Sequence, residues 1–281
     1  MPELPEVETI VRGLRRTVLG RRFTGVRLGK TDFIDDPALL AETLPGTRIA
    51  AIDRYGKSIW LSLEPAGQGG TGFYFFIHLG MTGQLIPREA ASPVAPHTHV
   101  FLTLDDGREL RYTDIRRFGR MAVFPQAGAA QFREALGADP LEISEAEFLK
   151  RIGARRARIK ALLLDQRVLR GVGNIYADES LWRARIHPAR VAANIQPRQL
   201  RDLYRAIRKV LAEAIRLGGS SISDFLNAEG NPGEFQIRHR VYDRKGKPCS
   251  RCGAAIRRGV VAGRGSYFCP RCQRSPRNTK K

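Results

Sequence analysis

The chain of 281 residues has no long apolar run, only four cysteines, and few acidic residues for its many basic ones. Its longest apolar stretch, residues 72–79, is far shorter than the roughly 20 residues that a membrane-spanning helix needs. The opening segment 1–6 contains two prolines and two glutamates, and it lacks the basic start and apolar core of a signal peptide. These absences predict a cytosolic protein with no membrane partner.

Acidic residues are scarce relative to basic ones, with 28 Asp and Glu against 48 Lys and Arg and a formal net charge of +20. The electrostatic field of so positive a protein attracts polyanions, and nucleic acid is the usual partner. A ribosomal or chromatin-type binder carries the same charge, so charge alone does not decide the function. A membrane-surface protein is disfavoured because the sequence has no long basic amphipathic helix. The hydrophobic fraction of 42% predicts a globular protein, with room for two or three domains at this length.

The few cysteines are arranged in two closely spaced pairs separated by sixteen residues: Cys249, Cys252, Cys269 and Cys272. Thiols of a cytosolic protein are reduced or bind metal rather than forming disulfides. The spacing is typical of a zinc ribbon, whose four thiolates surround the ion as a tetrahedron. Because the protein then fills every position on the metal, we predict one structural Zn²⁺. An iron–sulfur centre is the alternative for this ligand set.

The hydrophobic pattern predicts an α+β multidomain chain. Apolar residues from Val7 to Val18 repeat at helical spacing after Pro5 and predict an N-terminal helix. Short alternating strands over about 48–123 predict a β-sandwich. An Ala- and Gly-rich linker is expected at 125–130, followed by helices over 145–217 that end at two glycines. The predicted domain boundaries are 1–127, 128–230 and 231–281.

The N-terminus carries a candidate nucleophile. A small residue after the initiator permits removal of Met1, which exposes the secondary amine of Pro2. A free amine attacks an aldehyde-like carbon to give an imine, and the flanking Glu3 and Glu6 are a candidate proton donor and an orienting base. Taken alone this pattern is weak, because prolines and glutamates commonly just open a helix.

Two further motifs fit contacts with DNA. Glycines 171 and 173 precede a helix that starts at Asn174, predicted as its N-cap, and backbone N–H groups there can hold a phosphate. Lys160 lies on the preceding helix, although an ordinary helical hairpin explains this pattern equally well. In the second motif, Arg116 and Phe118 follow a strand and, with Met81, could wedge open a base stack. Core packing is the commoner role for such Met and Phe side chains.

Together these motifs resemble one family along nearly the whole chain, formamidopyrimidine-DNA glycosylase, also called 8-oxoguanine DNA glycosylase. The matching segments are MPELPEVE at 1–8, Lys57 after Tyr55-Gly56, HLGMTG at 78–83, HTHV at 97–100, YTDIRRFG at 112–119, GVGNIYADE at 171–179, and the four-cysteine ribbon with Arg264 before its second pair. Their order and combination are highly specific, so the resemblance favours the functional interpretations over helix capping and core packing.

The resemblance implies an N-terminal helix on a β-sandwich, a helix–two-turn–helix domain and a zinc ribbon, with damaged duplex DNA held between them by a monomer. Pro2 would attack C1′ of the damaged nucleotide, Glu3 would assist opening of the sugar ring, and Glu6 would support the site. Lys57 would contact the phosphate and help catalysis, and Arg264 would hold the phosphate at the lesion, so both count among the catalytic residues. The other implied DNA contacts are His97, Arg156, Lys160 and Asn174 on the backbone, and Met81, Arg116 and Phe118 in the gap left by the flipped base.

The implied activity is excision of oxidised purines followed by β,δ-elimination at the abasic site, which needs no metal or redox cofactor. The implied location is the bacterial cytoplasm, with the protein associated with the nucleoid through DNA binding. One alternative is the sister family endonuclease VIII, which prefers oxidised pyrimidines; another is a non-catalytic zinc-containing DNA-binding protein. The resemblance leaves open whether the loop 220–237 orders on the damaged base, and it assigns no role to the glycine-rich turn 67–72.

Overall fold

The computed structural model describes residues 2–65, 72–222 and 224–275. The chain divides into two compact units, residues 1–135 with 217–234, and residues 136–216 with 235–281. Met1 and most of the glycine-rich turn 67–72 lie outside the described residues.

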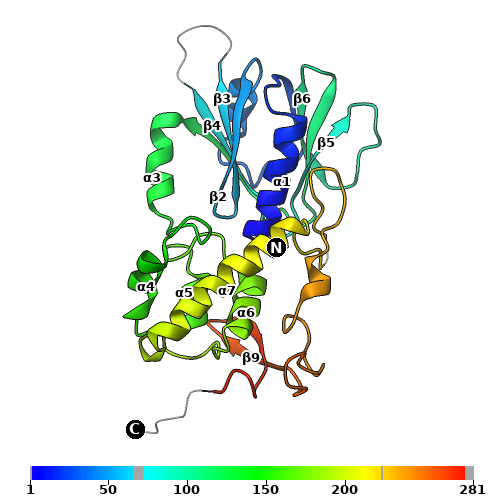
Figure 1. The fold of residues 1–281 in the computed structure, drawn as a ribbon. Helices are drawn as coiled ribbons and strands as arrows, with labels where there is room; N and C mark the ends of the chain where they lie inside the picture. The colour runs from blue at the N-terminus through cyan, green and yellow to red at the C-terminus, as the bar shows by residue number, and fades with distance from the viewer. Residues whose placement is uncertain (1, 66–71, 223, 276–281) are drawn as a thin grey trace. The chain divides into compact units, whose positions relative to one another are not determined.

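The first unit begins with helix α1 (Leu4–Thr17), which has Pro5 in its first turn. The fixed φ of proline suits a helix start, where its missing N–H costs no hydrogen bond. The predicted apolar face of this helix is confirmed, since Val7, Ile10 and Leu14 are fully buried. Figure 1 shows α1 lying against the strands, where it contacts members of both sheets.

Two antiparallel four-stranded sheets form the body of the first unit. The first sheet has the order β1 (Phe23–Leu28), β6 (Thr98–Leu104), β7 (Arg108–Thr113) and β5 (Gln84–Glu89). The second has the order β2 (Arg48–Tyr55), β3 (Ser58–Glu64), β4 (Phe73–His78) and β8 (Arg120–Pro125). The short helix α2 (Pro37–Thr43) connects β1 to β2. The sandwich is confirmed, but its first strand begins well before the predicted region.

The predicted linker at 125–130 is wrong. This segment forms a 3-10 turn (Gln126–Gly128) and then helix α3 (Ala129–Glu134). The outer face of the second sheet carries aromatic side chains around Trp60, and Phe132 of α3 packs on Trp60 with ring centroids 5.6 Å apart. Alanine favours a helix, and the helix covers aromatic surface that would otherwise face water.

Helices dominate the second unit. They are α4 (Glu145–Gly153), α5 (Ile159–Leu164), α6 (Asn174–Arg183) and α7 (Pro197–Arg216), with 3-10 turns at Ala192–Asn194 and Phe235–Arg238. Helix α7 packs against α4 and α6 (Figure 1), and its buried apolar residues recur at helical spacing from Leu200 to Ala214. The hairpin of β9 (Arg257–Val261) and β10 (Arg264–Phe268) completes the unit. The helical region predicted over 145–217 is confirmed.

The segment that follows α7 belongs to the first unit. Gly218 and Gly219 have positive φ angles of 72° and 83°, a conformation that glycine adopts without a steric penalty. They end the helix as predicted. Among the described residues, no helix is both long enough and apolar enough to cross a membrane.

Candidate functional site

The N-terminal residues of the first unit are held by a buried carboxylate. Pro2, Glu3 and Glu6 are all buried, and Glu6 accepts the backbone N–H of Glu3 at 2.8 Å. The other oxygen of Glu6 accepts the N–H of Ser220 at 2.7 Å. At the adjacent Gly219 an added Cβ would lie 2.9 Å from Glu6 Oε1. Glu6 therefore ties the start of the chain to the segment that follows α7.

Lys57 lies half-buried in the turn between β2 and β3. The turn is tied to α1 through Arg54, which donates to Glu8 at 3.0 Å and to the carbonyl of Gly56 at 3.3 Å. Burial lowers the pKa of His78, and the positive charge of Lys57 lowers it further. The His78 ring is therefore uncharged at neutral pH and presents no second cation to Lys57.

Exposed side chains gather on the loops that follow β4 and β7. Met81 is 39% exposed and Phe118 is 56% exposed, which disfavours the core-packing alternative for both. The Arg116 guanidinium lies 4.5 Å from the centroid of the Phe118 ring, within the range of a cation–π contact. These exposed side chains have the mixed cationic and apolar character that insertion into a base stack needs.

Asp114 organises these loops, a role that sequence reasoning missed. This fully buried residue accepts hydrogen bonds from the Thr82 hydroxyl at 2.5 Å, the Tyr112 hydroxyl at 3.0 Å and the Gly119 N–H at 3.0 Å. Close packing adds to this constraint, because a Cβ on Gly80 would lie 2.3 Å from the Phe118 carbonyl carbon. The two loops are thus fixed to each other. The sequence signal that could have identified it is an acidic residue directly after the strand Arg108–Thr113.

His97 is exposed and has a φ of 63°, which is uncommon for a residue other than glycine. Its carbonyl accepts the N–H of Asp114 at 3.0 Å. The loop that carries His97 is thus bonded to the backbone of Asp114, the residue whose carboxylate fixes the loops after β4 and β7 to each other.

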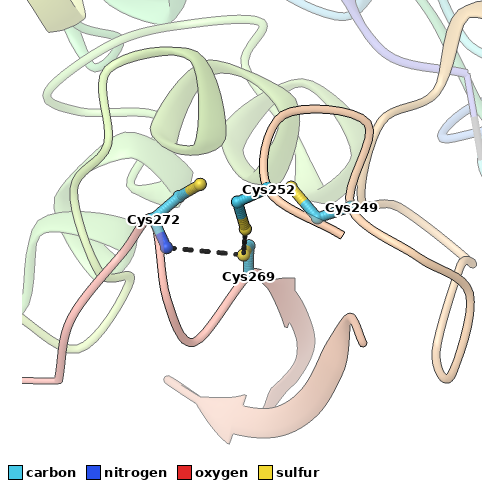
Figure 2. A group of neighbouring side chains, drawn as sticks. All are labelled: Cys249, Cys252, Cys269 and Cys272. Carbon is cyan, nitrogen blue, oxygen red and sulfur yellow. Dashed lines mark hydrogen bonds between the residues drawn. The ribbon is translucent and has the colours of Figure 1, made fainter. Parts of the chain in front are cut away.

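The second unit contains the four cysteines, whose sulfurs all lie within 4.8 Å of one another. Figure 2 shows them turned toward a common centre, with one pair before β9 and the other after β10. Zinc–sulfur bonds of about 2.3 Å at tetrahedral angles require sulfurs about 3.8 Å apart, and Cys252 and Cys269 are separated by 3.4 Å. This donor set suits one structural zinc, as predicted.

Arg264 opens strand β10 and is exposed. It pairs with Val261 across the hairpin, and the two turn residues, Ala262 and Gly263, both have positive φ. That geometry is the tight turn whose twist matches a β-hairpin. The hairpin therefore presents Arg264 next to its tip, as the proposed phosphate contact requires.

The predicted roles of Asn174 and Lys160 need correction. The N-cap of α6 is Gly173, and the Asn174 carboxamide instead donates to the Gly265 carbonyl at 3.0 Å. Lys160 is fully buried, with its ammonium 2.6 Å from Asp178. A side chain with no exposed surface cannot hold the DNA backbone directly. Arg156 is exposed in the connection between α4 and α5, where a phosphate contact is sterically open.

Sequence reasoning also missed Glu179. Its fully buried carboxylate accepts the consecutive backbone N–H groups of Arg240, Val241 and Tyr242 at 2.9 Å each. Burial raises the pKa of Glu179, and these hydrogen bonds oppose the rise. The sequence signal that could have identified it is the pair of adjacent acidic residues, 178 and 179, among the apolar residues Tyr176, Ala177 and Leu181 of this helix.

Three family models match the chain in order. They are "Formamidopyrimidine-DNA glycosylase N-terminal domain" over residues 1–121, "Formamidopyrimidine-DNA glycosylase H2TH domain" over 136–226, and "Zinc finger found in FPG and IleRS" over 246–274. The fold and site thus define a multidomain protein that joins a β-sandwich to an H2TH domain and a four-cysteine zinc finger. The chain belongs to the formamidopyrimidine-DNA glycosylase family, which confirms the resemblance and the predicted fold class.

Individual relatives are similar to this chain over their full length. The chain is 46% identical over 279 residues to the formamidopyrimidine-DNA glycosylase of Solibacter usitatus, covering 98% of this chain and 100% of that protein. A solved structure of Lactococcus lactis Fpg with abasic-site DNA matches with a TM-score of 0.89 at 32% identity, covering 97% of this chain and 100% of the other. A MutM in complex with carbocyclic 8-oxo-G containing DNA also matches with a TM-score of 0.89, at 33% identity, covering 98% and 100%.

Proposed function

We propose that this protein is a bifunctional DNA glycosylase and abasic-site lyase that excises oxidised purines from duplex DNA. Family membership supports the activity, and solved relatives bound to Fapy-dG and 8-oxo-G DNA support the substrate class. The observation that carries the proposal is the N-terminus itself. There, Pro2 and Glu3 are held at the start of α1 by the buried Glu6.

The proposed nucleophile is the amine of Pro2. After removal of Met1, this nitrogen attacks C1′ of the damaged nucleotide, the glycosidic bond breaks, and the base leaves with a proton. Glu3 donates a proton to the sugar ring oxygen, so the ring opens and the nitrogen–C1′ link becomes an iminium. An α-amino group has a reference pKa of about 8, against about 10.4 for lysine. More free base is therefore available at the chain end than at Lys57.

The iminium explains the second activity. It acidifies the hydrogen on C2′, whose loss expels the 3′-phosphate, and a second elimination expels the 5′-phosphate. Water then hydrolyses the iminium and releases the free amine. The proton transfers fall to Glu3, while Lys57 contacts phosphate. The zinc is structural in this scheme, and no step passes through it.

Lesion recognition requires the damaged nucleotide to leave the stack, at a cost of a few kcal/mol. We propose that Met81, Arg116 and Phe118 fill the gap. Arg116 offers only donors, which match the O2 and N3 acceptors of an orphaned cytosine. Arg264, His97, Arg156 and Asn174 are the proposed backbone contacts. Lys160 is not among them, because its side chain is fully buried.

Borohydride trapping tests the nucleophile. Reduction during reaction with 8-oxoguanine DNA should link protein to DNA, and mass spectrometry should map the adduct to the N-terminal peptide. Pro2→Gly leaves a primary amine and should retain weak trapping. Glu3→Gln keeps the shape but removes the acid, so it should bind lesion DNA and fail to excise the base. An adduct mapped to Lys57 would instead assign the reaction to a lysine.

The same assay separates the alternatives. Faster excision of thymine glycol than of 8-oxoguanine opposite cytosine would favour an endonuclease VIII-type specificity, and a Lactococcus lactis relative is itself solved with an oxidised pyrimidine. Binding without any trapped adduct would favour a non-catalytic DNA-binding protein. We also propose a monomer in the bacterial cytoplasm, associated with the nucleoid.

A further inference from the structure

A buried ion pair lies beneath the zinc-ribbon hairpin of the second unit. The ammonium of Lys160 on α5 lies 2.6 Å from Asp178 on α6, and neither side chain has any exposed surface. Burial raises the pKa of Asp178 to about 7, and the charge of Lys160 opposes the rise. Two opposite charges withdrawn from water lose much of their hydration, so such a pair is weak evidence for added stability.

The pair has a second set of contacts, all on strand β10. Lys160 also donates to the Gly265 carbonyl at 3.1 Å and to the Ser266 hydroxyl at 2.8 Å. Asp178 accepts the Tyr267 N–H at 2.8 Å. The pair therefore holds three consecutive residues of one strand. Arg264 immediately precedes those residues in the chain.

These contacts fix the orientation of strand β10 as well as its distance from the ion pair. An ammonium carries three donors at tetrahedral angles, and the structure gives Lys160 three acceptors: the carboxylate, the carbonyl and the hydroxyl. Asn174 adds a second donor to the Gly265 carbonyl. An apolar pair of similar size would fill the same space without orienting the strand.

We propose that Lys160 and Asp178 are positioning residues for Arg264. They act on the reaction through the strand that begins at Arg264, and neither of them touches DNA. This proposal deepens the proposed function and rests on it where DNA binding or excision is measured, but not where deuterium exchange is measured. It replaces the direct phosphate contact expected for Lys160 from the sequence.

The test compares Lys160→Met, the double variant Lys160→Met with Asp178→Leu, Arg264→Ala, and the control Lys150→Met. Lys150 is exposed on α4, so its loss removes a charge of the same unit without touching the pair. Lys160→Met leaves a buried carboxylate uncompensated, whereas the double variant removes both charges and keeps the protein foldable. Zinc content of each purified variant establishes that the ribbon is intact.

Hydrogen–deuterium exchange measures how firmly strand β10 is held and requires no assay of activity. The peptide that contains residues 264–268 should exchange faster in the double variant than in the wild type or in Lys150→Met, because the Tyr267 N–H loses its acceptor. Unchanged exchange with zinc bound would overturn the proposal, whether or not the protein proves to be a glycosylase.

Salt titration of DNA binding measures whether the phosphate contact of Arg264 depends on the ion pair. Arg264→Ala should lower the slope of log K against log salt by about one unit. The double variant should lower it similarly and cause no further loss when combined with Arg264→Ala. Its single-turnover excision rate should fall by about 10- to 100-fold, the scale of a misplaced positioning group. Additive losses in the Arg264→Ala background would overturn the proposal, because they indicate an independent DNA contact.

Discussion

Glu6 offers the sharpest test of how the N-terminus is organised. Its carboxylate accepts two backbone N–H groups, from Glu3 at 2.8 Å and from Ser220 at 2.7 Å, while the side chain is buried. A carboxamide has only one oxygen. In Glu6→Gln, one N–H keeps its acceptor and the other faces an NH₂ donor. The substitution therefore keeps the shape and reverses the polarity at one contact.

The expected cost follows from these two contacts. Hydrogen bonds to a charged group contribute about 1.5–3 kcal/mol, and a buried donor without an acceptor costs about 1–3 kcal/mol. We expect Glu6→Gln to lower the free energy of unfolding by about 2–4 kcal/mol. Excision should slow by about tenfold or more, because Glu3 and the adjacent Pro2 lose a fixed position.

Urea unfolding followed by fluorescence measures the stability, and single-turnover trapping measures the chemistry. The matched control is Glu64→Gln, since Glu64 is 53% exposed and pairs with Arg48 on the surface. A surface substitution of this kind should change the free energy of unfolding by no more than about 0.5 kcal/mol. If Glu6→Gln matched the control in both assays, the argument that this carboxylate organises the N-terminus would fail.

Three further predictions concern other parts of the chain. Cys269→Ser should lose zinc and DNA binding together, since zinc binding is part of the folding energy of the ribbon; metal analysis of a variant that binds DNA normally without zinc would refute this. Arg116→Ala should lower excision and narrow the preference for cytosine over adenine opposite the lesion, whereas a uniform loss with the preference intact would mean that Arg116 only fills space. Burial lowers the pKa of His239 from 6.5 to about 4. Below pH 6.5 the unfolded chain therefore binds a proton at His239 that the folded protein does not bind. The free energy of unfolding falls by up to about 3 kcal/mol as the pH drops from 6.5 toward 4. Urea midpoints at about pH 7 and about pH 5 should show a smaller difference in His239→Gln than in the wild type, and an equal difference would exclude this histidine as the cause.

Local patterns determined much of this protein. The helix α1 follows from apolar spacing and from Pro5, both of which are properties of a few adjacent residues. The zinc site follows from two short cysteine pairs, because each pair already sets two ligands near one another. The order of the motifs along the chain was enough to predict the family and the fold class.

Elements that depend on distant partners were predicted poorly. The segment 125–130 reads as a linker, but it leads into a helix because aromatic residues of another element need cover. Strand β1 has a mixed burial pattern, so it shows little of the alternation that predicts a strand. Its place is set by pairing with β6, more than seventy residues later.

The tertiary structure alone decided which charged groups are buried and what they hold. Sequence spacing placed Lys160 near the DNA, whereas the fold encloses it with Asp178. Asp114 and Glu179 organise loops through backbone N–H groups that no residue type reveals. Charge and periodicity are local properties and can be read from a sequence. Burial depends on every neighbour at once, so a lysine at the surface and one inside the protein look alike until the chain is folded.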